Sequence, residues 1–392
     1  MRSELDKRAM AALSSGHCAV DFAGGALPAL LPFVVDRFDL SYTLAAAVML
    51  ASTASSSFVQ PLFGHWSDRR GGVWLLPAGV AIAAVGIGLA SASPSYPLVL
   101  LFVVLSGIGV AAYHPEASKA AAFASGRRRA SGMSLFSIGG NVGFALGPVV
   151  ATPLVLALGL TGGLLLAVPG LAVALVLSAL VPFIRGFVPE ERERLSGETG
   201  EDQPAALALL LGVISFRSIA WYGLITFVPL WELHLGHSKG EANRMLALML
   251  IAGGLGTIVA GPVADRLGRR PVLLASLAAT PPLILVFVLV GGAPGAIALA
   301  FVGVCVIGTF GVTMVMSQEY MPRNLGMASG LAIGLSIAPG GVLAVALGAL
   351  ADSVDLRTAL LVIAGVPTLA VLLGLLLPSA GRRPFAPEPV AP

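Results

Sequence analysis

A carboxylate and a histidine lie inside the first apolar stretch of the chain. Asp21 follows His17 by four residues, and no other charged residue occurs between positions 9 and 35. On a helix, residues four apart share a face. A carboxylate at membrane depth is costly, and such groups commonly handle ions or substrates. The pattern predicts that Asp21 binds protons and that His17 contacts a solute; a buried Asp held by backbone or serine partners is the alternative.

A second group of titratable residues surrounds a proline. His114 and Glu116 flank Pro115, and Lys119 follows. Proline removes a helix hydrogen bond and kinks the segment. Because residues two apart do not share a helix face, we expect one of His114 and Glu116 to face a cavity and the other a neighbouring helix or Lys119. Together with Asp21, both are predicted to couple proton movement, with His114 as a relay. The H-x-E spacing lacks the i, i+4 histidine pair of helical metal enzymes, so we expect no metal, no other cofactor and no enzymatic activity.

One arginine lies within an apolar stretch of the second half. The sequence repeats with a shift of 197 residues, which sets Arg217 opposite position 20, beside Asp21. We expect both at one depth, as a charge pair or on either side of an anionic solute; an ion pair that only locks the halves is the alternative. A guanidinium keeps its charge and presents a planar fork that suits phosphonate or carboxylate groups. The predicted solute-binding set adds amides and aromatic residues: Arg217, His17, Gln60, Asn141, Trp221 and Tyr222.

The pattern Gly-x-x-x-Asp-Arg occurs twice, each time at the end of the second apolar stretch of its half. Glycine lets helices approach closely, and an Asp at a helix end can pair with Arg or bind backbone amides. Two copies at equivalent positions favour a latch between helices over a solvated turn. This predicted cytoplasmic gate consists of Gly64, Asp68, Arg69, Gly261, Asp265 and Arg266.

Membrane helices must position these residues. Of the 392 residues, 57% are hydrophobic and 11% charged, against about a quarter charged in soluble domains, which excludes a soluble enzyme. A formal charge of +3 is too small to indicate nucleic-acid binding, and both cysteines lie in apolar stretches, which gives a disulfide framework no support. A crossing needs about 20 apolar residues. Twelve segments qualify: 11–34, 43–66, 73–92, 97–124, 129–157, 162–184, 206–233, 242–264, 271–291, 294–317, 324–351 and 358–378.

The repeat divides the chain into two bundles of six helices. Residues 1–184 form the first, 185–204 a polar cytoplasmic linker, and 205–392 the second with a short tail. With the N-terminus inside, the inner loops carry 17 Lys and Arg and the outer loops 4, so the positive-inside rule predicts that both termini are cytoplasmic. Parallel repeats of this kind place a binding site near the membrane midplane, between the halves. We expect an all-α membrane protein that works as a monomer.

The gate motif resembles the loop signature between helices 2 and 3 of the major facilitator superfamily. The second copy continues through Gly268-Arg269-Arg270 as the signature does, whereas the first reads Arg70-Gly71-Gly72. Gly143-x-x-x-Gly147-Pro148 is similar to the antiporter motif of the superfamily's drug exporters, with Ala151-Thr152 in place of its later glycines. Val103 stands where the helix 4 motif has an arginine. The resemblance implies two pseudo-symmetric six-helix bundles that rock about a central site.

Further blocks are similar to the fosmidomycin-resistance family of bacterial efflux proteins. They are His17, Val20-Asp21, 27–32, Gln60-Pro61, 113–117, 132–136 and 139–141, with Gln318-Glu319, Pro322 and Gly340-Gly341 in the second half. The resemblance implies an antiporter of the bacterial inner membrane that exports a small, drug-like, anionic solute such as fosmidomycin in exchange for protons. A proton symporter or a facilitator that imports an organic anion is the alternative, and a passive channel or receptor remains open.

Overall fold

Helices account for nearly all of the chain that the computed structural model describes, which comprises residues 5–70, 72–125, 129–186, 201–322, 325–335 and 337–378. These residues contain no strand. Helices suit the long apolar runs because a helix satisfies its backbone hydrogen bonds within the segment, as the bilayer requires. In chain order the elements are α1 (Lys7–Phe38), α2 (Tyr42–Arg70), α3 (Leu75–Ala92), α4 (Tyr96–Ala124), α5 (Arg129–Gly162), η1 (Gly163–Leu166), α6 (Ala167–Arg185), α7 (Pro204–His234), α8 (Lys239–Leu267), α9 (Arg269–Leu289), α10 (Gly292–Gly308), α11 (Phe310–Tyr320), α12 (Leu325–Gly330), η3 (Leu331–Leu335), α13 (Ala338–Ser353) and α14 (Leu356–Gly374).

These elements form twelve membrane crossings. The described residues contain 11 apolar spans long enough to cross a bilayer, and one of them, Leu135–Arg185, has 51 residues. That span turns back on itself, because Gly159 adopts a φ of 70° and the short helix η1 follows it. Glycine tolerates this left-handed conformation without strain. The span therefore crosses twice, as α5 and α6, and the predicted all-α fold of twelve crossings is confirmed.

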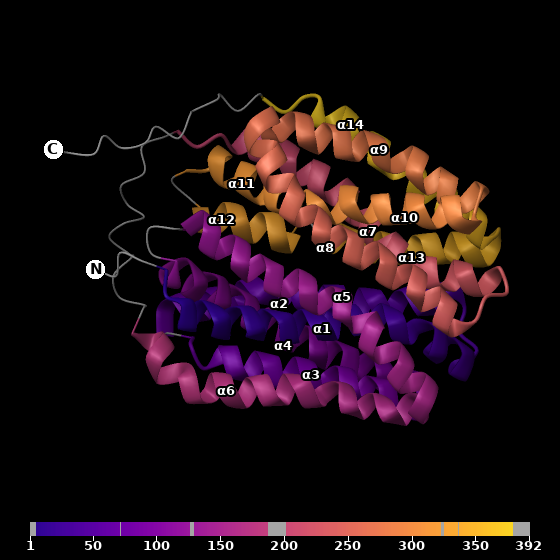
Figure 1. Ribbon diagram of the computed structural model, residues 1–392, viewed down its shortest axis with the longest axis horizontal. Helices are drawn as coiled ribbons and strands as arrows, with labels where there is room; N and C mark the ends of the chain where they lie inside the picture. Colours follow the sequence, from indigo (N-terminus) through magenta and orange to yellow (C-terminus); the bar gives the residue numbers. More distant parts are fainter. Residues whose placement is uncertain are drawn as a thin grey trace.

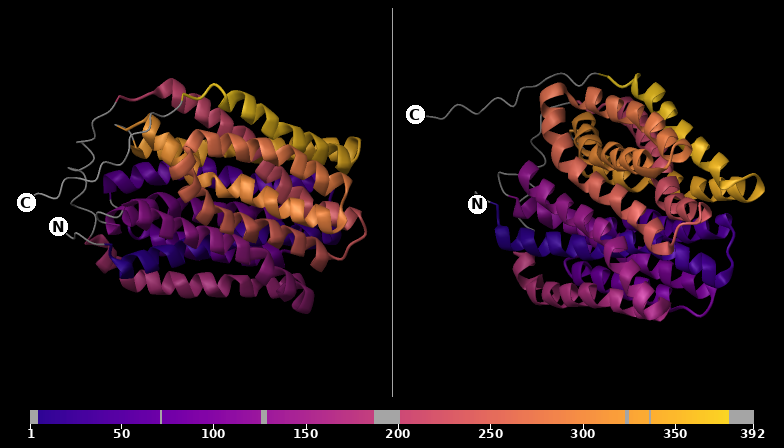
Figure 2. Two further views of the ribbon diagram at one scale, coloured as in Figure 1. Left: turned by 45° about the horizontal axis from the view of Figure 1, so that its top comes forward. Right: turned by 45° about the vertical axis from the view of Figure 1, so that its right-hand side comes forward.

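The helices form two groups that lie side by side. Helices α1 to α6 occupy one half of the molecule and α7 to α14 the other (Figure 1). The halves meet where α2 packs on α13, α5 on α8, and α1 on α7. Two further views show the two groups of helices packed against each other (Figure 2). Helix α1 begins and α14 ends at the same end of the molecule, which we name the terminal end; the opposite end is the distal end. The predicted linker, 185–204, falls largely on residues 187–200, outside the described part of the chain.

Glycines let α5 lie directly on α1. A Cβ on Gly139 would overlap the carbonyl of Ser14, and one on Gly143 the carbonyl of Cys18. Gly147, one turn further along, meets the backbone of α1 in the same way. Small residues at four-residue spacing allow such close helix contact. This close contact brings α5 against the face of α1 that carries His17 and Asp21. Pro148, which follows Gly147, is also buried.

Two crossings predicted as continuous are interrupted. The segment 294–317 breaks between α10 and α11 at Thr309, whose φ and ψ are −86° and 5°. The segment 324–351 contains the π-helical turn η3 between α12 and α13. Interruptions at membrane depth are tolerated where the freed backbone groups are buried in protein or line a cavity. The break at Thr309 coincides with the site of a buried charge described below.

At the distal end, three contacts tie the halves together. Lys239 of α8 pairs with Asp36 of α1 at 2.6 Å. Asp352 of α13 accepts hydrogen bonds from the first backbone amides of α2, at 2.7 Å from Tyr42 and 2.9 Å from Thr43. Asn243, nearly fully buried, donates to the carbonyl of Ala29 at 2.8 Å. We call these contacts the distal ties. The Asp352 contact caps a helix of one half with a carboxylate of the other.

Candidate functional site

Three titratable side chains meet near the middle of α1. His17 Nε2 lies 3.3 Å from Asp21 Oδ2, and His114 Nε2 of α4 lies 3.4 Å from Asp21 Oδ1. The side chain of Asp21 is 24% exposed, so the carboxylate is partly accessible. We call these three residues the His-Asp cluster. The structure thus places two predicted proton-coupling residues in contact, and it adds His17, which the sequence had suggested as a solute ligand.

Backbone carbonyls and an aromatic ring hold both imidazoles. His17 Nδ1 lies 2.8 Å from the carbonyl oxygen of Phe136, and His114 Nδ1 lies 2.9 Å from that of Val110. The His17 ring stacks on the ring of Phe136, with centroids 4.2 Å apart. The ligand atoms of the cluster lie within 4.8 Å of one another, close enough to share one small cation. Both Nε2 contacts run to the same carboxylate, so protons between these atoms can hold the three groups together.

Glu116 lies outside the cluster. Its side chain is 1% exposed and pairs with Lys119 Nζ at 2.8 Å. The arrangement follows from the two-residue spacing, which turns His114 toward Asp21 and Glu116 toward another face of α4.

Arg217 is buried on α7 with neutral partners. It is 5% exposed, and it donates to Thr309 Oγ1 at 3.3 Å and to Thr313 Oγ1 at 3.2 Å. Both threonine hydroxyls donate their own protons to carbonyls of the interrupted crossing, which leaves their lone pairs free for the guanidinium. No carboxylate in the described residues pairs with Arg217, so the expected contact with Asp21 is absent in this conformation. The repeat predicts that Asp21 and Arg217 lie at one depth, but in this conformation each side chain contacts other partners.

Three of the other predicted solute ligands lie along the boundary between the halves. Asn141 donates to Thr257 Oγ1 across it at 3.2 Å, and Trp221 lies against Phe144, with ring centroids 5.7 Å apart. The structure adds three partners of Arg217 and His17 that the sequence does not predict: Thr309, Thr313 and Phe136. They are uncharged residues within apolar stretches, and no spacing pattern distinguishes them. Of the remaining predicted ligands, Tyr222 faces Thr53 of α2, and Gln60 is half-buried on α2.

The two glycines of the predicted gate make no close helix contact. The nearest atom to a Cβ on Gly64 would be 3.6 Å away, on Pro115, and a Cβ on Gly261 would meet nothing within 4 Å. Asp265 is exposed and lies 3.6 Å from Arg269, which also pairs with Glu319 of α11. Arg266 is exposed. The side chains of Asp68 and Arg69 lie outside the described part of the structure.

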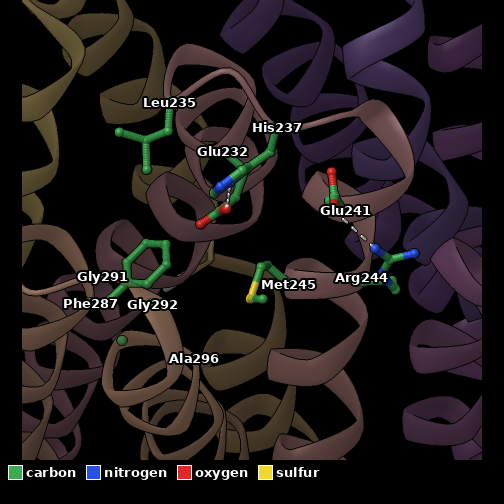
Figure 3. Close-up of a pocket in the computed structure, with 11 residues that line it drawn as sticks. Glu232, Leu235, His237, Glu241, Arg244, Met245, Phe287, Gly291, Gly292 and Ala296 are labelled. Atoms are coloured by element: carbon green, nitrogen blue, oxygen red, sulfur yellow. Dashed lines mark hydrogen bonds and ion pairs between the residues drawn. The ribbon is translucent and has the colours of Figure 1, made fainter.

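A separate cavity of about 280 Å³ lies at the distal end of the second half (Figure 3). The ends of α7 to α10 enclose it. Its polar groups pair with one another: Glu232 with His237 at 2.6 Å, and Glu241 with Arg244 at 3.5 Å. All of its lining residues belong to one half of the molecule, so it is not the expected site between the halves.

Comparisons with known proteins agree with this architecture. The sequence profile described as Major Facilitator Superfamily matches residues 13–238 and 210–392. An uncharacterized MFS-type transporter of Bacillus subtilis, YfnC, is 32% identical over 93% of this chain and 91% of its own length. The fosmidomycin resistance protein of Escherichia coli is 27% identical over the same shares.

Solved structures share the fold. A bacterial homologue of the human lysosomal transporter Spinster superposes with a TM-score of 0.76 at 17% identity, covering 96% of this chain and 98% of the other. A D-xylose-proton symporter superposes with a TM-score of 0.75 at 14% identity, covering 95% and 98%. The twelve crossings, the two packed halves and the profile match over both halves lead to one conclusion: the chain is a multi-pass membrane transporter of the major facilitator superfamily.

Proposed function

We propose that the protein exports a small organic anion across a bacterial inner membrane in exchange for protons. The observation that carries this proposal is the buried guanidinium of Arg217, whose partners in the described residues are neutral. A buried charge without a counter-charge is costly. The carboxylate or phosphonate of a solute would supply that counter-charge, through the bidentate contacts that a guanidinium favours. Fosmidomycin, a phosphonate, is the first solute to test, because a relative confers resistance to it.

The excess of Lys and Arg in the loops at the terminal end supports a cytoplasmic position for that end. In this orientation the distal ties close the outer side, while the gate glycines stand apart on the cytoplasmic side. The conformation then faces inward, ready to take solute from the cytoplasm. Outward opening requires the distal ties to break and the gate at Gly64 to Arg69 and Gly261 to Arg266 to close.

In the proposed cycle, Asp21 takes up a proton from outside as the solute leaves, with His114 as relay. Protonation removes the attraction between Asp21 and Arg217 and favours return to the inward-facing state, in which the two residues use other partners. Release of the proton to the cytoplasm restores the attraction. Glu116 pairs with Lys119 on another face of α4 and takes no part in this cycle.

Proton movement in energised everted vesicles tests this function. A pH dye reports the gradient while fosmidomycin, then other phosphonates and lipophilic drugs, are added. We expect a solute to dissipate the gradient only in vesicles that contain the protein. Uptake of an organic anion together with protons in intact cells would instead establish a symporter, and solute movement independent of the gradient a facilitator.

Removal of the Asp352 carboxylate is expected to shift the protein toward the outward-facing state. Loss of a capping group costs about 1 kcal/mol, or roughly fivefold in the ratio of the two conformations. Spin labels at the exposed Arg37 and Arg357 would report the distal separation of the halves. Asp352→Ala should add longer distances to the distribution.

The matched control is Asp355→Ala. Asp355 caps α14 within its own half, where it accepts from the amide of Thr358 at 2.6 Å, so its loss removes a cap but no tie. Equal distance distributions for Asp352→Ala and the unsubstituted protein would contradict a gating role for this contact.

A further inference from the structure

The backbone fixes which nitrogen of each histidine in the His-Asp cluster carries hydrogen. His17 Nδ1 faces the carbonyl of Phe136 at 2.8 Å, and His114 Nδ1 faces the carbonyl of Val110 at 2.9 Å. A carbonyl oxygen only accepts hydrogen bonds, so both Nδ1 atoms donate. A neutral imidazole carries a single N–H. In their neutral forms, both rings therefore turn a bare lone pair on Nε2 toward Asp21.

Both Nε2 atoms lie against oxygens of one carboxylate, His17 at Oδ2 and His114 at Oδ1. A lone pair and an ionised oxygen repel each other at 3.3 or 3.4 Å. Each contact becomes attractive when a proton lies between the two atoms, whether it is bonded to nitrogen or to oxygen. The cluster therefore has two places for a proton beyond those on Nδ1.

We infer that the cluster binds two exchangeable protons, one on each side of Asp21, and that His17 is the second proton-binding residue. That both protons are used in transport rests on the proposed function; the capacity itself rests on the geometry alone. His17, which the sequence predicts as a solute ligand, is thus assigned to proton binding.

In the part of the chain that the structure describes, no fixed positive charge competes with these protons. Among the described residues, no Lys or Arg pairs with Asp21, and the titratable groups that face it are Cys18 of α1, Tyr113 of α4 and Tyr222 of α7. The hydroxyl of Tyr113 donates to the carbonyl of Leu13 at 2.5 Å. With neutral neighbours and two histidines around it, the carboxylate is balanced by protons within the cluster, on a histidine or on its own oxygens.

A glycine of α5, Gly140, leaves room for the His-Asp cluster. Gly140 of α5 presents backbone there, and a Cβ at this position would lie 2.6 Å from Asp21 Oδ2 and 2.6 Å from His17 Nε2. Gly140→Ala therefore separates His17 from Asp21 without removing either titratable group. Gly365→Ala of α14, where a Cβ meets nothing within 4 Å, is the matched control.

Nitrogen NMR of the full-length protein in lipid nanodiscs, with ¹⁵N-labelled histidine, tests the capacity directly. The chain has 5 histidines, and His17→Gln and His114→Gln assign two of them. We expect both rings to carry hydrogen on Nδ1 when neutral and both to gain a second N–H on acidification. Gly140→Ala should move the titration midpoint of His17, and Gly365→Ala should leave it in place. Hydrogen on Nε2 of either neutral ring, or one ring that never gains its second N–H, would overturn the inference.

A second arm measures use of the protons in transport. In proteoliposomes clamped at zero membrane potential, with fosmidomycin as the probe, one pH unit sustains about a 100-fold solute gradient if two protons are exchanged and about a tenfold gradient if one is. We expect His17→Gln to lower the sustained gradient toward tenfold. A tenfold gradient in the unsubstituted protein would overturn the use of two protons. No proton flux with any solute, while both rings titrate, would instead overturn the proposed function and leave the two-proton site in place.

Discussion

Replacement of Arg217 by Gln is expected to weaken binding of an anionic solute strongly while the protein remains folded. Hydrogen bonds to a charged group contribute about 1.5–3 kcal/mol, which corresponds to roughly 10- to 150-fold in Kd. The guanidinium is buried beside Thr309 and Thr313, and no carboxylate of the described residues pairs with it. Its loss therefore also removes a desolvation cost. We therefore expect the thermal midpoint of Arg217→Gln in detergent to equal or exceed that of the unsubstituted protein. Fosmidomycin binding and thermal unfolding on the same samples check both statements.

Two further variants separate recognition from simple charge. Arg217→Lys keeps the charge but loses the planar fork, so we expect it to bind the anion more weakly than the unsubstituted protein. Arg244→Gln removes an arginine whose side chain is 72% exposed, and it should leave binding unchanged. If Arg217→Gln unfolded readily, or if it bound fosmidomycin normally, Arg217 would be a structural residue.

The crossings could be predicted from the sequence because composition alone determines them. A bilayer selects about 20 apolar residues, and the helices begin and end within a few residues of the predicted segments. The break at Thr309 could not be predicted in this way. Thr309 contacts the guanidinium of Arg217 from a distant helix, and such a contact leaves no periodic signal in either segment.

Only the part of the site that lies within one helix could be predicted from the sequence. The four-residue spacing of His17 and Asp21 places them on one face of α1, a local property of any helix. The contact of His114 with Asp21 depends on the axial register of α4 against α1, where a Cβ on Gly16 would overlap the Tyr113 side chain. That register is a result of packing. The internal repeat likewise suggests equal depth for Asp21 and Arg217, but depth alone does not determine which partner each side chain selects.

Replacement of Asp21 by Asn is expected to uncouple solute movement from protons. The amide has the size of the carboxylate but does not titrate, and it cannot attract a proton on either histidine as an ionised carboxylate does. Proton flux in everted vesicles should fall to the level of vesicles that lack the protein. Because Arg217 and its threonines are unchanged, exchange of labelled for unlabelled fosmidomycin across the membrane should persist.

Glu116→Gln is the matched control, since it also removes a buried carboxylate from the first half. Its partner, Lys119, belongs to the same helix and lies outside the cluster. We therefore expect Glu116→Gln to lower thermal stability and to keep proton coupling in the molecules that fold, the opposite of the Asp21→Asn result. Two carboxylates in one bundle would then differ in role because one faces protonatable imidazoles and the other faces a fixed ammonium. If Asp21→Asn kept full proton-coupled flux, the cluster would be a structural pin between α1 and α4, and the proton path would have to run elsewhere.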